Sequence, residues 1–122
     1  MVINATLGKV TMQAEGYVGP TNWGLHFDAE QWLKRGRFDI AAVIAQTAFE
    51  VTRRRVLAAK PTFRSLLRRR LKAHPRWSRY EKLRVDVRNA FTHEGKRPAG
   101  PDAIEFVECV GDLMRVMEAV LN

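Results

Sequence analysis

Apolar and polar positions alternate only at the start of the chain, where the pattern allows two short strands. Between residues 2 and 17 apolar side chains recur loosely at every second position, and Gly8-Lys9 in the middle can form a turn. A two-stranded hairpin is only marginally stable by itself, so it would have to pack on the rest of the chain or on a partner chain. Residues 16–24, which include Gly19-Pro20, indicate a loop.

Helical spacing dominates the remainder of the chain. A first short helix is predicted to begin at Asp28, because Asp28 and Gln31 can satisfy the free N–H groups of a helix start. Residues 37–59 are apolar on most sides, which is typical of a helix at the centre of a bundle. Pro61 and Pro75 then bound a shorter helix with a narrow apolar stripe and many arginines.

Two further helices are each introduced by a pair of residues with the spacing of a capping box. Ser78 and Glu81 begin a helix with one apolar face, and Asp102 and Glu105 begin the last helix, which extends to about residue 121. In this last helix Ile104 is expected to be buried with the other apolar residues at helical spacing. The sequence therefore predicts an all-α bundle of four to five helices, with a short β-hairpin allowed at the N-terminus.

Length and composition are those of one soluble domain. With 122 residues, of which 46% are apolar, the chain can build a single hydrophobic core. No apolar run approaches the roughly 20 residues that a membrane span requires, and the N-terminus lacks the pattern of a signal peptide. The single cysteine, Cys109, cannot form an intrachain disulfide and is expected to be a core residue. We therefore expect a cytoplasmic protein that does not bind membranes.

Positive charge is concentrated in one part of the chain. Residues 53–97 hold 16 of the 21 lysines and arginines and only three acidic residues, whereas the remainder has five basic residues against ten acidic ones. Such a block favours an anionic partner, most commonly nucleic acid, although a solvated arginine surface would give the same pattern. The candidate RNA-binding residues are Arg68, Arg69, Arg70, Arg79, Lys96 and Arg97.

Two aromatic residues lie among these basic ones. Trp77 and Tyr80 alternate with Arg76, Arg79 and Lys82. Aromatic side chains between cations can bind single-stranded nucleic acid by base stacking and phosphate contacts. Core anchors with solvated neighbours give the same pattern, so the sequence supports both interpretations equally.

No metal site and no cofactor site is predicted. His26, His74 and His93 are scattered, and no pair of potential ligands has the spacing for metal binding on a helix. The chain also lacks a glycine-rich phosphate loop.

A short motif ends the helix that follows Ser78. It is the run Arg88-Asn89-Ala90-Phe91-Thr92-His93, which combines a cation, an amide and an imidazole. The run resembles the signature of the HEPN superfamily, an arginine followed after four to six residues by a histidine, often with a polar residue after the arginine. A long apolar helix before the motif, and a loop and amphipathic helix after it, are similar to the helix order of HEPN domains. The resemblance implies an HEPN-like helical domain over residues 26–122, with an N-terminal extension over residues 1–25.

The resemblance implies that this motif is a metal-independent endoribonuclease site. In such cleavage a base takes the proton of a ribose 2′-OH, and the oxygen attacks the adjacent phosphorus and leaves a 2′,3′-cyclic phosphate. By resemblance His93 is the general base or acid, Arg88 the phosphate clamp and Asn89 an orienting hydrogen-bond partner. Glu50 is the fourth candidate, because HEPN-like packing of two helices would pair its carboxylate with Arg88. An ion pair between Glu50 and Arg54 on the same helix is equally compatible with the sequence.

The spacing of the motif raises the question of a second copy. Arg88 and His93 are five residues apart, so a regular helix separates them by about 140°. They converge only if the helix loosens near His93 or if two copies face each other, and the resemblance favours a homodimer. It also implies a role as a toxin of a toxin–antitoxin pair or in defence against phage, with an antitoxin or regulatory protein as partner. Many HEPN-like domains are not enzymes, so a non-catalytic RNA-binding or protein-interaction module is the alternative.

Overall fold

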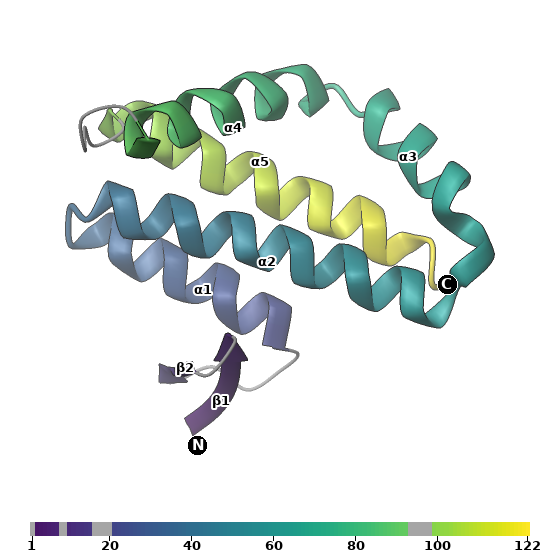
Figure 1. Cartoon of the computed structure of the whole chain (residues 1–122), viewed down its shortest axis with the longest axis horizontal. Coiled ribbons are helices and arrows are strands. Elements are labelled where there is room, and N and C mark those ends of the chain that lie inside the picture. Colours follow the sequence, from purple (N-terminus) through teal and green to yellow (C-terminus); the bar gives the residue numbers. More distant parts are fainter. Residues whose placement is uncertain (1, 8–9, 16–20, 93–98) are drawn as a thin grey trace.

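The computed structural model describes residues 2–7, 10–15, 21–92 and 99–122, with the side chains of residues 21–87 and 99–122. Its five α-helices are α1 (Thr21–Lys34), α2 (Phe38–Ala59), α3 (Arg64–Ala73), α4 (Trp77–Thr92) and α5 (Gly100–Ala119), and the 3-10 turn η1 (Pro61–Phe63) joins α2 to α3 (Figure 1). The antiparallel strands β1 (Val2–Leu7) and β2 (Val10–Glu15) lie beside α1, where the alternating pattern allows strands.

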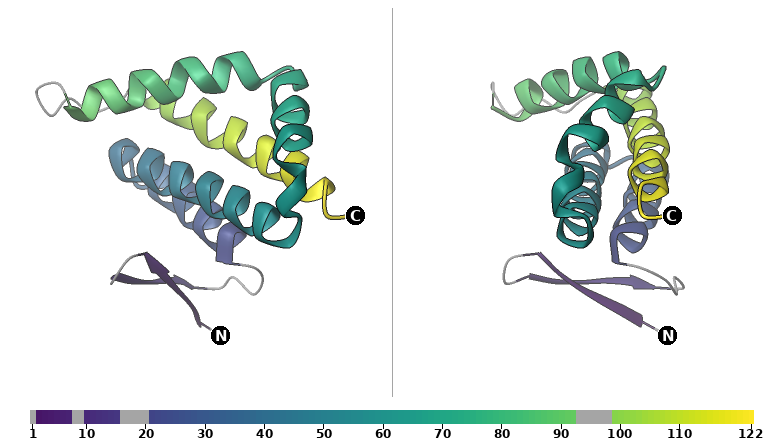
Figure 2. Two further views of the ribbon diagram at one scale, coloured as in Figure 1. Left: turned by 45° about the vertical axis from the view of Figure 1, so that its right-hand side comes forward. Right: turned by 90° about the vertical axis from the view of Figure 1, so that its right-hand side faces the viewer.

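The helices form an all-α bundle, as the sequence predicts. Helices α1 and α2 pack against each other, and α5 packs on both of them. Helix α4 lies along α5 and also contacts α2, while α3 connects the end of α2 to the start of α4 (Figure 2). Helix α3 therefore begins near the C-terminal end of α2 and ends near the start of α4. The rest of α3 is not packed closely on α2.

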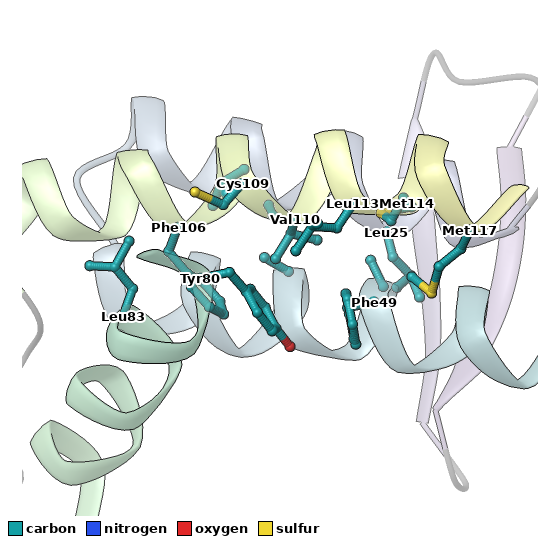
Figure 3. Close-up of a cluster of buried hydrophobic side chains, with 14 of the residues drawn as sticks. Leu25, Phe49, Tyr80, Leu83, Phe106, Cys109, Val110, Leu113, Met114 and Met117 are labelled. Atoms are coloured by element: carbon teal, nitrogen blue, oxygen red, sulfur yellow. The ribbon is translucent and has the colours of Figure 1, made fainter. Parts of the chain in front are cut away.

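The core lies where α2, α4 and α5 meet. Tyr80 of α4 stacks between Phe49 of α2 and Phe106 of α5, with ring centroids 4.8 Å and 5.7 Å away (Figure 3). Leu83 is fully buried beside these rings. Cys109 is also buried, as predicted, and burial raises the pKa of its thiol.

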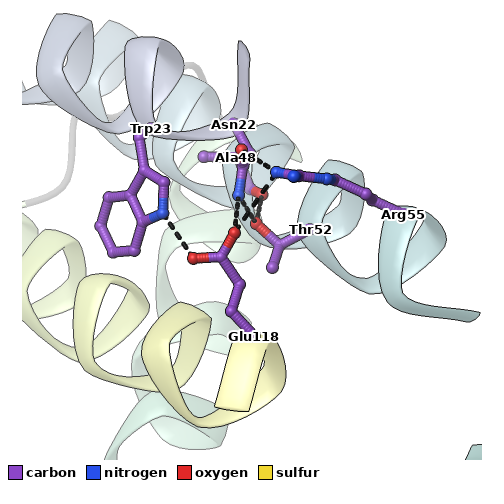
Figure 4. A network of polar contacts seen from close by, with 6 residues as sticks. All are labelled: Asn22, Trp23, Ala48, Thr52, Arg55 and Glu118. Atoms are coloured by element: carbon purple, nitrogen blue, oxygen red, sulfur yellow. Dashed lines mark hydrogen bonds and ion pairs between the residues drawn. The ribbon is translucent and has the colours of Figure 1, made fainter. Parts of the chain in front are cut away.

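Helix α1 begins earlier than its sequence indicates. Residues 21–24 were expected in a loop and Asp28 at a helix start, but the helix begins at Thr21 and Asp28 lies inside it. Figure 4 shows the reason, because Asn22 and Trp23 bind groups of α2 and α5. The Asn22 amide donates to Thr52 Oγ1 (3.0 Å) and to Glu118 Oε2 (3.2 Å), and Trp23 Nε1 donates to Glu118 Oε1 (2.6 Å).

The polar network around Glu118 shows that the helical part of the chain begins before residue 25. It fastens the first turn of α1 to the bundle, so the boundary expected between residues 25 and 26 falls inside a helix that packs on α2 and α5. Arg55 of α2 adds an ion pair of 3.4 Å to Glu118.

The expected capping boxes are wrong at both later helices. Helix α4 begins at Trp77, so Ser78 lies in its first turn, and the N–H of Arg76 is instead bound by His74 Nδ1 at 3.1 Å. Helix α5 begins at Gly100 after Ala99, without a side-chain cap. The Asp102 carboxylate lies 3.7 Å from Arg79 of α4, so it interacts with a neighbouring helix and does not cap its own.

Ile104 is a second departure from the expected last helix. It was predicted to be buried, but 44% of it is exposed. Phe106, Val110 and Met114 of the same helix are buried, as predicted.

Gly111 of α5 lies directly against His26 of α1. A Cβ atom at this position would lie 2.8 Å from His26 Nε2 and 3.1 Å from His26 Cε1. The ring has little freedom to move, because His26 is buried and its Nε2–H donates to the Val107 carbonyl at 2.9 Å. We expect Gly111→Ala to lower the free energy of unfolding by about 1–2 kcal/mol, since overpacking outweighs the helix propensity that alanine adds.

A double-mutant cycle with His26→Ala, measured by urea denaturation, tests this contact. Without the imidazole ring, Gly111→Ala should raise the free energy of unfolding by roughly 1 kcal/mol, because only the propensity difference remains. If Gly111→Ala stabilises the protein in both backgrounds, the close approach of His26 does not constrain α5.

Candidate nucleic-acid interface

A groove lies between α2, α3 and α4 and encloses a volume of about 680 Å³. Its floor is apolar and nearly closed to solvent, because Phe49, Leu67, Leu71 and Tyr80 belong to the buried core. Its walls carry the charged residues Glu50, Arg53, Arg64, Arg68, Lys72, Glu81 and Arg84, together with Leu57 and Trp77. We call this feature the basic groove.

The net charge of the basic groove comes from α3. On α2, Arg53 pairs with Glu50 at 2.8 Å, and on α4, Arg84 pairs with Glu81 at 3.3 Å, so these walls are close to neutral. The three cations of α3, Arg64, Arg68 and Lys72, are exposed and form no ion pair with any residue whose side chain is described. They recur every four residues, which places them on one face of the helix about 6 Å apart along its axis.

On the side of α4 that faces α5, Arg79 and the preceding Arg76 are neutralised by acids of α5. Arg79 Nη2 lies 2.8 Å from Glu105 and 3.7 Å from Asp102. Arg76 lies 3.3 Å from Asp112 and 3.7 Å from Glu108. The hydrogen bond from Arg79 lowers the pKa of the Glu105 carboxyl. The arginines that face α5 are therefore compensated by its acids, whereas Arg64, Arg68 and Lys72 in the groove have no acidic partner among the described side chains.

The six candidate RNA-binding residues have different surroundings. Arg68 lines the basic groove, whereas Arg69 and Arg70 are exposed on α3 away from it. Arg79 is occupied by the acids of α5. Lys96 and Arg97 lie outside the described residues.

Sequence reasoning missed Arg64 and Lys72 as groove residues. A signal was present, since Arg64, Arg68 and Lys72 have the i, i+4, i+8 spacing of a single helix face. The signal became specific only when the packing of α3 showed that this face borders a cavity.

The two aromatic residues of the basic block have different surroundings. Tyr80 is only 1% exposed, so its ring is a core element and not a platform for bases. Burial raises the pKa of Tyr80, and its hydroxyl donates to Gln46 Oε1 at 3.0 Å. Trp77 is half-buried on the groove wall, with its ring 5.4 Å from that of Tyr80. Only Trp77 retains a surface that a ligand in the groove can reach.

Glu50 lies partly exposed on the wall of the basic groove. Its side chain is 31% exposed and pairs with Arg53, not with Arg54. Its second contact is the Gln46 amide, which donates to Oε1 at 3.2 Å. The predicted pairing with Arg88 concerns a side chain that is not described.

The Arg88–His93 motif lies at the end of α4. Arg88 and Asn89 are within this helix, which continues to Thr92, but their side chains and the whole of His93 lie outside the described part. Position 88 follows Arg84 by four residues and therefore shares its helix face, one turn further along α4. Arg84 is the described residue of the basic groove that lies farthest along α4, and position 88 follows it by one helical turn.

No cluster of three potential metal ligands occurs among the described side chains, and no described helix is long and apolar enough to cross a membrane. Comparisons with protein-family models, with curated proteins and with solved structures find no match to this chain. The resemblance to HEPN domains thus depends on the motif and the helix order alone.

Proposed function

We propose that the chain is a metal-independent endoribonuclease that binds RNA in the basic groove and cleaves it at the Arg88–His93 motif. One observation supports this most strongly. Three cations of α3 that form no ion pair with any described side chain line one groove, and its α4 wall includes Arg84, one helical turn before position 88. Cations of this kind bind the phosphates of a nucleic acid and release its counterions, which supplies most of the affinity.

The motif contains the groups that cleavage by the 2′-OH requires. In the proposed mechanism His93 takes the proton of the 2′-OH and can return it to the leaving 5′-oxygen, because its ordinary pKa lies near neutrality. Arg88 stabilises the charge on the phosphoryl oxygens, and Asn89 orients one of the reacting groups by a hydrogen bond. The products would be a 2′,3′-cyclic phosphate and a free 5′-OH.

The active form we propose is a homodimer. Helix α4 extends to Thr92, and at regular helical spacing positions 88 and 93 would lie about 140° apart. Two copies that face each other would place the arginine of one motif near the histidine of the other. In the biological setting that we propose, a toxin or phage-defence component, an antitoxin or regulatory protein would control this activity.

The second candidate is a non-catalytic RNA-binding module. It is favoured by the completeness of the groove, since Arg64, Arg68, Lys72 and Trp77 can bind a strand without any residue of the motif. The two proposals differ in whether bound RNA is cut.

A pair of matched oligonucleotides distinguishes them. The purified protein is incubated in EDTA with an unmodified RNA and with the same sequence carrying 2′-O-methyl groups, and the ends of any fragments are analysed. We expect both strands to bind and only the unmodified RNA to be cleaved, with cyclic phosphate ends. Binding of both without cleavage would support the module, and cleavage that appears only after a divalent metal is added would refute the proposed mechanism.

A further inference from the structure

We infer that the basic groove is a nucleotide-binding subsite, in which successive phosphates lie along Arg64, Arg68 and Lys72 and one unpaired base lies against Trp77. This inference rests on the proposed function only in taking RNA as the ligand. It does not require that the bound strand be cleaved.

The phosphate part of the subsite follows from the arrangement of α3. Its three cations lie on one face, with one turn of helix between neighbours, and all of them border the same cavity. The ion pairs Arg53–Glu50 and Arg84–Glu81 leave the facing walls without excess positive charge. Phosphates are therefore attracted to α3 more than to the other walls. The backbone of a strand in the groove would lie along α3, and its bases would face α2 and α4.

The base part of the subsite follows from the apolar residues that α4 and α2 contribute to the groove. The ring of Trp77 is held against the buried Tyr80, and its remaining surface borders the cavity. Leu57 of α2, also half-buried, supplies a second apolar surface in the groove. The volume of about 680 Å³ lies within the range of pockets that enclose small organic ligands, which is sufficient for one nucleotide.

The subsite discriminates against duplexes. A base within a duplex is stacked on its neighbours and would have to leave the stack to reach Trp77. An unpaired base can stack on an aromatic side chain directly, and such stacking is tolerant of sequence.

The first test removes the charges. Binding of a fluorescent 2′-O-methyl oligonucleotide, which the proposed mechanism cannot cleave, is measured by anisotropy over a range of salt concentrations. We compare Arg64→Gln/Arg68→Gln/Lys72→Gln with Lys34→Gln/Arg54→Gln/Lys82→Gln, which removes three exposed charges outside the groove. The groove variant should bind at least tenfold more weakly and lose about 2 from its salt slope, whereas the control should stay within threefold of wild type.

The second test removes the base and leaves the protein unchanged. A strand with abasic sites throughout, and a duplex of the same sequence, should each bind about tenfold more weakly than the single strand.

Trp77→Leu should remove the preference for the normal strand over the abasic strand, provided that circular dichroism shows an intact fold.

The results separate the inference from the proposed function. Equal binding by the groove variant and the control, equal binding of normal and abasic strands, or no binding of RNA by wild type would overturn the inference. If the groove is required for binding but unmodified RNA is never cleaved, the inference stands and the endoribonuclease proposal fails.

Discussion

The His93→Ala variant should cleave RNA about 10²–10⁴-fold more slowly than wild type while binding it with the same affinity. In the proposed mechanism the imidazole accepts the proton of the 2′-OH, and this variant keeps the cations Arg64, Arg68 and Lys72 of the basic groove. The cleavage rate is measured in single-turnover reactions in EDTA with saturating protein. Affinity is measured separately with the 2′-O-methyl strand.

Two control variants complete this experiment. The triple groove variant at Arg64, Arg68 and Lys72 should show the opposite pattern, with weaker binding and a nearly unchanged rate at saturation. His74→Ala removes a histidine that binds the N–H of Arg76 at the start of α4, at the other end of that helix from the motif, and it should retain cleavage. Wild-type cleavage rates in His93→Ala would mean that the motif is not the catalytic site.

The helices could be predicted from the sequence wherever apolar spacing is strong. Residues 37–59 are apolar on most sides, and the observed α2 extends over Phe38–Ala59 in the middle of the bundle. The start of α1 could not be predicted, because the run that contains Asn22 and Gly24 has weak helix propensity. Its helical state is supported by bonds to Thr52 and Glu118, which are 30 and 96 residues from Asn22 in the chain.

The positive charge of the candidate site could be predicted from the sequence, but the ion pairs and the residues that line the groove could not. The excess of basic residues between positions 53 and 97 indicated an anionic partner, yet it gave no sign that Arg79 is neutralised by Glu105 of α5. Pairing of this kind depends on which helix faces which, and a sequence read in one dimension does not contain it. The same reason explains why Arg64 and Lys72 could be assigned to the groove only after α3 had been placed.

Tyr80→Ala should lower the free energy of unfolding by about 3–5 kcal/mol, the range for removing a large buried aromatic side chain. Tyr80 is 1% exposed and is stacked against both Phe49 and Phe106, so its removal leaves a cavity at the junction of three helices. Small domains are stable by only about 5–15 kcal/mol, so this single change would consume a large part of the total. Urea denaturation followed by circular dichroism measures it.

Tyr80→Phe separates the ring from its hydroxyl. This variant keeps both stacking contacts and loses only the hydrogen bond to Gln46, which should cost about 1 kcal/mol. It should also keep its RNA affinity, because the ring still supports Trp77 at the groove wall. If Tyr80→Phe is as unstable as Tyr80→Ala, the bond to Gln46 and not the aromatic stack holds α4 on α2. If it is stable but binds RNA weakly, the hydroxyl contributes to RNA binding in the groove. This outcome is open to Tyr80 because it belongs to the core and also lines the groove.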